Sequence, residues 1–184
     1  MANHVSDFKK APEDIIFDLI AFDNPSKPIN ATVVDLGVAT IATGANPPAN
    51  TDLEVTSKAG SGYSGAVSVA YNRLAVQGFI AAAGVSGNEL IIPVGDAVKY
   101  ADLIDEINTA LGINLTAKDY VDGDIGDWAG TPNETKEVQI VMAADSYVFT
   151  GTLTLTLHAE DIPLSSVITT TTLSGLNYPT APVV

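Results

Sequence analysis

Residues 149–158 read Phe-Thr-Gly-Thr-Leu-Thr-Leu-Thr-Leu-His, and this stretch decides the fold that we expect. Threonines and leucines alternate over residues 152–157, which is the period-two pattern of a strand with one buried face. We therefore expect a strand over 151–158, with its leucines facing the core. The threonines and His158 are expected on the opposite face.

The same pattern occurs earlier in the chain. Residues 63–69, Tyr-Ser-Gly-Ala-Val-Ser-Val, match residues 149–155 at an offset of 86: an aromatic residue, a hydroxyl residue, a glycine and an alternating run. Two more pairs match at an offset of 84: FDLIAFDN at 17–24 with ADLIDEIN at 101–108, and I-N-x-T-x-x-D at 29–35 and 113–119. Three matches in the same order predict a duplicated module.

Each copy is expected to begin with a helix. Pro12 suits a first helical turn, and the acidic Glu13 and Asp14 suit the positive end of a helix. Gly112 is placed to end the second helix in a left-handed cap. The apolar stripes at helical spacing are Ile15, Ile16, Leu19 and Ile20 in the first copy and Leu103, Ile104, Ile107 and Leu111 in the second.

The shared I-N-x-T-x-x-D motif predicts a short capped turn after each helix. Thr116 and Asp119 are three residues apart, so the hydroxyl and the carboxylate can each accept a backbone N–H. Thr32 and Asp35 have the same spacing, and we expect them to form the same turn.

Further strands are expected at 33–43, 53–58, 65–71, 90–94, 136–142 and 164–173. The composition of 46–51 and 122–133 indicates loops. The predicted fold is therefore α+β and strand-dominated, with two tandem copies of a helix-plus-antiparallel-sheet module. The first module covers 1–95, and the second, with the C-terminal strand and tail, covers 96–184.

The composition limits the function. The 184 residues include 22 acidic and 8 basic ones, for a net charge of −14. This charge argues against nucleic acid as a partner, because phosphate binding needs a basic face, and against docking on anionic membranes. Cysteine is absent, so disulfides, thiolate nucleophiles and cysteine metal sites are excluded. No signal-like or membrane-spanning apolar run is found, and we expect a globular, soluble protein.

Two motifs resemble ligand sites. Residues 60–65, Gly-Ser-Gly-Tyr-Ser-Gly, match G-x-G-x-x-G, but a strand pattern follows where a dinucleotide site needs a helix. We therefore expect glycines at positive φ in a hairpin turn.

Four aspartates, Asp119, Asp122, Asp124 and Asp127, crowd one loop. Calcium favours such loops, but from Asp122 the EF-hand pattern fails at Gly126 and Asn133. The alternatives are a calcium site and a solvated acidic loop. Trp128 is expected to anchor this loop to the module, with a ligand surface as the alternative.

No catalytic, cofactor-binding or metal-binding residue is predicted. His4 lies near the N-terminus, and His158 lies on the polar face of a strand. The nucleophile-elbow motif G-x-S-x-G is absent, and no nucleophile–base pair stands out. We therefore expect a protein without enzymatic activity.

Four stretches together resemble a small duplicated α+β domain found in virion structural proteins of large tailed bacteriophages. They are residues 60–74, 102–119, 144–157 and 171–179, and the resemblance covers most of the chain. It implies a particle component located in the virion and made in the host bacterial cytoplasm. It brings no active-site residues with it.

The resemblance implies a structural protein that assembles as repeated subunits on the outer surface of the head, as a capsid decoration, or on the neck or tail. Its expected partners are other virion proteins and copies of itself, through strand edges and terminal segments. One alternative is a carbohydrate- or host-cell-surface-binding β module. Another is a calcium-dependent, adhesin-like domain.

Overall fold

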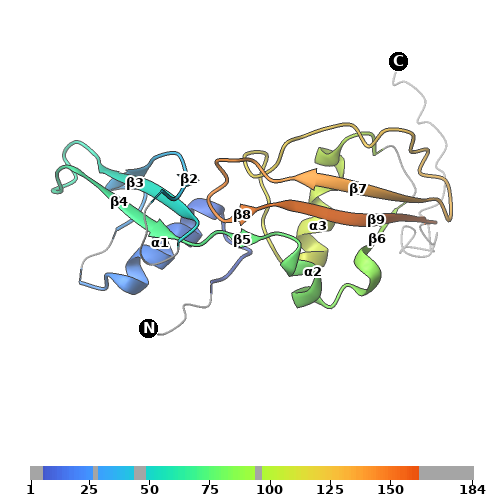
Figure 1. Cartoon of the computed structure of the whole chain (residues 1–184), viewed down its shortest axis with the longest axis horizontal. Coiled ribbons are helices and arrows are strands. Elements are labelled where there is room, and N and C mark those ends of the chain that lie inside the picture. Colours follow the sequence, from blue (N-terminus) through green and yellow to red (C-terminus); the bar gives the residue numbers. More distant parts are fainter. Residues whose placement is uncertain (1–5, 27–28, 44–48, 94–96, 162–184) are drawn as a thin grey trace, which may run out of the picture.

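The computed structural model describes residues 6–26, 29–43, 49–93 and 97–161 (Figure 1). This part of the chain is mixed α+β with more strand than helix. Its elements are α1 (Pro12–Asp23), β1 (Val34–Leu36), β2 (Thr40–Ile41), β3 (Thr51–Ser57), β4 (Ala66–Tyr71), β5 (Leu74–Ala75), α2 (Gly78–Ala83), η1 (Ser86–Asn88), β6 (Glu89–Pro93), η2 (Tyr100–Leu103), α3 (Ile104–Leu111), β7 (Thr135–Val141), β8 (Phe149–Thr150) and β9 (Thr152–Glu160). None of the helices described is long and apolar enough to span a bilayer. The strand predicted at 164–173 lies outside the described residues.

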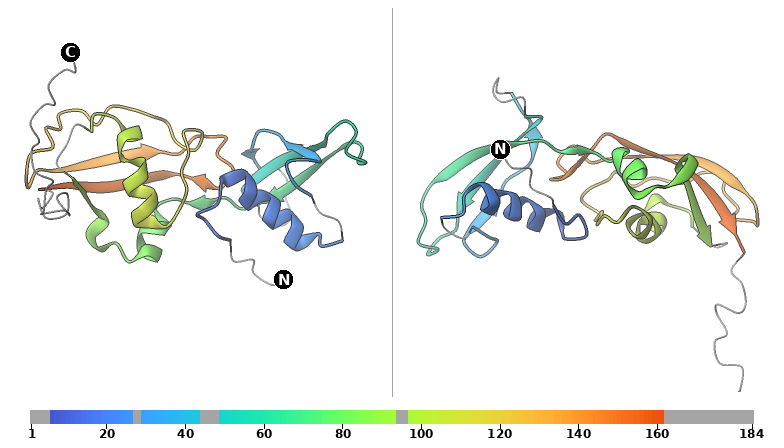
Figure 2. Two further views of the ribbon diagram at one scale, coloured as in Figure 1. Left: turned by 180° about the vertical axis from the view of Figure 1, so that it is seen from behind. Right: turned by 90° about the horizontal axis from the view of Figure 1, so that it is seen from below.

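The elements form two lobes (Figure 1). In the N-terminal lobe, α1 lies against an antiparallel sheet with β3 in the middle (Figure 2). β1 and β2 pair with one edge of β3, and β4 pairs with the other. Pro12 occupies the first turn of α1, as predicted, because a helix start needs no N–H there.

In the C-terminal lobe, β9 is the central strand of the sheet β6-β9-β7, and α3 crosses one face of it with α2 beside it (Figure 2). β7 is antiparallel to β9, but β6 is parallel to it. The predicted purely antiparallel sheet is therefore wrong for this lobe. A parallel pair is possible here because the long segment between β6 and β9, which includes α3, returns the chain to the starting end of the sheet.

A parallel strand pair also joins the two lobes. β5 pairs with β8, and the amides of Leu74 and Val76 donate to the carbonyls of Val148 and Thr150 at 2.9 and 3.0 Å. Residues 74–93 therefore hydrogen-bond to strands of the predicted second module. The division into 1–95 and 96–184 stays a prediction about the sequence, and backbone pairing crosses it.

Most of the predicted apolar side chains form the core, although Leu19 and Ile20 of α1 are only half-buried. Leu153, Leu155 and Leu157 are at most 1% exposed, as the alternation of β9 predicts. All four stripe residues of the second helical segment are buried, and Gly112 caps α3 with φ +65°. The largest buried cluster also includes Ile15 and Ile16 of α1, so one core extends through both lobes.

The hairpins β3–β4 and β7–β9 share their local geometry. Gly65 and Gly151, the glycines of the repeated motif, have φ of +87° and +85°. The amides of Ser57 and Met142 donate to the carbonyls of these glycines at 3.0 and 2.9 Å. The prediction that both glycines lie at positive-φ strand entries is therefore confirmed.

The duplication of a whole module is not confirmed. β4 is an edge strand of its sheet, whereas β9 lies in the middle of its own. The strand predicted at 33–43 is wrong in extent, because the chain breaks there into β1 and β2. Between them the Gly37 amide donates to the Glu54 carbonyl at 2.8 Å, so the chain stays along the edge of β3.

The positive φ predicts how glycine substitutions act. Gly65→Ala and Gly151→Ala should each lower the free energy of unfolding by about 1–2 kcal/mol, because an L-residue with a side chain is strained there. A Cβ at either position meets no atom within 4 Å, so the cost arises in the backbone alone.

Gly78→Ala is the matched control. Gly78 also has open space for a Cβ, begins α2 and lacks a positive φ. We expect it to be neutral or stabilising by up to about 1 kcal/mol. Urea denaturation measures all three variants, and equal effects at the three glycines would contradict the argument.

Candidate functional site

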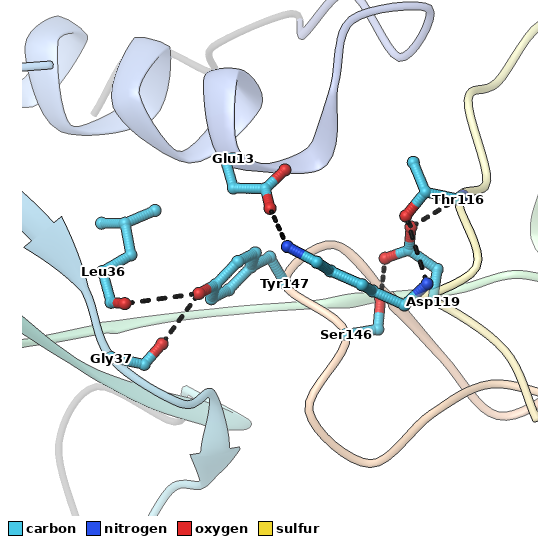
Figure 3. A network of polar contacts seen from close by, with 8 residues as sticks. Glu13, Leu36, Gly37, Thr116, Asp119, Ser146 and Tyr147 are labelled. Carbon is cyan, nitrogen blue, oxygen red and sulfur yellow. Dashed lines mark hydrogen bonds and ion pairs between the residues drawn. The ribbon is translucent and has the colours of Figure 1, made fainter. Parts of the chain in front are cut away.

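A network of polar contacts lies where the two lobes meet, and we call this region the joint (Figure 3). Asp119, only 2% exposed, is at its centre. One carboxylate oxygen accepts the Thr116 amide at 2.9 Å and the Thr116 hydroxyl at 2.7 Å. The other accepts the Ser146 hydroxyl at 2.7 Å. The capped turn predicted from Thr116 and Asp119 is therefore confirmed, and its aspartate is buried.

The same turn does not form in the first copy of the motif. The Thr32 amide and hydroxyl both donate to Asn30 Oδ1, at 2.9 and 2.6 Å. Asp35 instead lies in β1 and pairs with Lys58 Nζ at 3.2 Å. The prediction for Thr32 and Asp35 is wrong, because Asp35 has entered a strand and its carboxylate is directed to a neighbouring lysine.

Arg73 supplies a buried positive charge to the cluster. It is 8% exposed, and its Nε donates to Thr51 Oγ1 at 2.8 Å. Its Nη1 donates to the carbonyls of Ala144 and Ser146 at 2.7 and 3.0 Å. Ser146 therefore bonds Arg73 through its carbonyl and Asp119 through its hydroxyl. One residue connects two buried opposite charges.

Two tyrosines extend the joint into the N-terminal lobe. The Tyr71 hydroxyl donates to the Tyr147 carbonyl at 2.7 Å. The Tyr147 hydroxyl in turn donates to the Gly37 carbonyl at 2.9 Å (Figure 3). Burial raises the pKa of both phenols, and the Arg73 charge opposes that rise at Tyr71. Both tyrosines therefore act as neutral hydrogen-bond donors.

A pocket of about 350 Å³ lies over this joint. Glu13 and Lys118, whose Oε1 and Nζ are 3.4 Å apart, line it together with Asp119 and Tyr147. The Lys118 side chain is 82% exposed, so this ion pair contributes little to stability. The buried polar groups below are bonded to one another, an arrangement that holds segments together.

The acidic loop and Trp128, the other candidate ligand sites, do not form a binding site in the described residues. Asp122, Asp124 and Asp127 are exposed while Asp119 points inward, so the four aspartates do not converge. Within the described ranges, no three histidine or acidic side chains are grouped to hold a metal ion. Trp128 packs against the core, which confirms it as an anchor of the loop. Its indole N–H is buried and has no hydrogen-bond partner in the described part of the chain.

The glycine motif forms a turn, and His158 makes a contact between strands. Gly60, Gly62 and Gly65 all have positive φ, which confirms the turn that we expected at 60–65. His158 Nδ1 lies 2.8 Å from Glu89 Oε1, and this contact joins β9 to β6. His4 lies outside the described residues. Arg73 and Ser146 were missed, and the one available signal was that Arg73 is the single arginine of the chain.

Removal of the Ser146 hydroxyl tests the joint. Ser146→Ala takes one of three side-chain hydrogen bonds from buried Asp119, so the free energy of unfolding should fall by about 2 kcal/mol. Ser68→Ala, at an exposed position of β4, is the control and should change it by less than about 0.5 kcal/mol. Equal values for the two variants in urea denaturation would show that Ser146 does not connect the charges.

The raised pKa of Tyr71 predicts an alkaline effect. The folded-state pKa lies above the ordinary value of 10.0, so the stability contributed by the neutral phenol is complete below pH 10. It is lost as the pH rises further, because the unfolded chain ionises first. Tyr71→Phe should lose about 1 kcal/mol near neutrality and decline less steeply than the unmodified protein above pH 10. Parallel slopes in stability measured against pH would refute this.

No curated protein and no solved structure matches the chain. One family model matches residues 5–184, nearly the whole length. Its description is a family of unknown function, and the chain belongs to this family, DUF7941.

Proposed function

We propose that the chain is a non-enzymatic structural protein of a tailed bacteriophage particle. It assembles as repeated subunits on the outer surface of the head, neck or tail, and its partners are copies of itself and other virion proteins. The observation that carries the proposal is the set of apolar side chains exposed along strand edges. They are Val67 on β4, Ile91 on β6 and Val141 on β7, at 59, 55 and 50% exposure.

Such edges suit assembly. An edge strand offers unpaired backbone groups, and another chain can extend the sheet through them. β4, β6 and β7 each pair with a single neighbouring strand in the described part of the sheets. Apolar side chains on these edges would be buried by a neighbouring subunit.

The joint between the lobes also supports a structural role. Arg73 and the two tyrosines hydrogen-bond across the junction of the lobes, and Asp119 holds Ser146, a partner of Arg73. A subunit that carries load between neighbours needs such connections. The net charge of −14 would keep the protein away from packaged DNA.

The proposal also covers the repeat found in the sequence. We infer that the hairpins β3–β4 and β7–β9 are two copies of one module, although their sheets differ around them. The matched glycines and the equivalent hydrogen bonds of Ser57 and Met142 support this inference.

The proposal predicts where the chain is found. In a lysate of the host, the chain should band with tailed particles on a density gradient and remain with them after the DNA is released. Quantitative mass spectrometry of the purified particles should find many copies per particle, with an abundant host cytoplasmic protein as the control for contamination. A chain found only in the soluble fraction would contradict the proposal.

A further inference from the structure

An apolar groove lies on the N-terminal lobe, between the end of α1 and the hairpin β3–β4. Its volume is about 390 Å³, and none of its lining residues is charged. Its lining includes Ile20 from α1, Val34 from β1 and Val55 from β3. Val67 and Val69 from β4 also line it. Val67 is 59% exposed, so α1 leaves this end of the sheet uncovered.

The groove lies along an open strand edge. β4 pairs with β3 on one side, and its other side has no strand partner among the described residues. In the register of the pair, Val67 lies opposite Val55 and Val69 opposite Leu53, so these side chains share one face. A strand added to β4 would therefore place every second side chain over the groove.

The chain contains a segment suited to this edge. Residues 162–184 include no charged residue, although the whole chain has a net charge of −14. Within them, 167–172 read Val-Ile-Thr-Thr-Thr-Thr, six consecutive β-branched residues with strong strand preference. Residues 59–72, which include β4, are likewise uncharged. The two segments can meet without the repulsion that opposes contact between other parts of two acidic copies.

The geometry places the two segments on different copies. β9 runs from the junction of the lobes to the far end of the C-terminal lobe (Figure 1), and its nine residues span about 30 Å. The link from Asp161 to Leu164 reaches only about 10 Å. A strand that starts at Leu164 therefore cannot lie along β4 of its own chain.

We propose that residues 164–173 of one copy dock as a strand on the open edge of β4 in a second copy, over the apolar groove. This inference rests on the proposed structural role and names its contact. Each copy would accept a strand at one end and donate one at the other. The contact is therefore head-to-tail and generates a ring or a filament.

Crosslinking of full-length chains tests the contact. Because the chain has no cysteine, single-cysteine variants report on one position each. Ser68→Cys on β4 is mixed with a differently tagged Thr170→Cys chain and treated with a short bismaleimide, which tolerates a small shift in register. Gln139→Cys, exposed on β7, replaces Ser68→Cys in the control. We expect at least tenfold more mixed dimer from the first pair.

A second measurement tests the groove. Val67→Asp and Val98→Asp change similarly exposed valines, one on β4 and one just before η2 in the C-terminal lobe. In sedimentation velocity of full-length chains, Val67→Asp should weaken self-association at least tenfold. Val98→Asp should change it by less than twofold.

The outcomes separate the two proposals. Self-association without a difference between the valine variants, or between the crosslinked pairs, would overturn the docking and leave the structural role intact. A chain carrying both Ser68→Cys and Thr170→Cys that crosslinks within itself at high dilution would show that the segment folds back on its own copy. An unmodified chain that stays monomeric at every concentration would overturn the docking and self-assembly together.

Discussion

The bonds of Ser146 to two buried charges are the interaction on which the rest of the structure depends. Arg73 and Asp119 lie in the interior, where an isolated charge costs several kcal/mol. Neither forms an ion pair with another described residue, and their bonds go to neutral groups around Ser146. The loop at 143–148 is therefore held in one place, and its ends fix β7 and β8. The two lobes meet at this loop.

Local patterns predicted much of the structure. Alternation predicted β3, β4, β7 and β9, because a half-buried strand requires period two whatever its neighbours are. The glycines of the repeated motif predicted two hairpin entries, because positive φ is a property of a single residue. The helical stripes and the Gly112 cap were predicted for the same reason: each depends on residues within one or two turns.

Pairing between distant segments was not predicted. β6 resembles any short apolar strand, and nothing in residues 89–93 indicates a parallel partner near residue 156. Arg73 was missed because its partners are backbone carbonyls, which any sequence provides. The two I-N-x-T-x-x-D motifs diverge for a similar reason. In the motif at 113–119, Asp119 accepts a hydrogen bond from Ser146, which lies in a distant loop. In the motif at 29–35, the Asp35 carboxylate pairs with Lys58 instead.

The central position of β9 has a consequence for how the chain is made. A ribosome releases β6 some sixty residues before β9, the strand that lies between β6 and β7. Until residue 160 has emerged, neither β6 nor β7 has its partner, and the leucine face of that sheet does not yet exist. The C-terminal core therefore forms only after nearly all of the described chain has been translated. Until then β6 and β7 expose apolar side chains, and long-range pairing of this kind is a feature that slows folding in general.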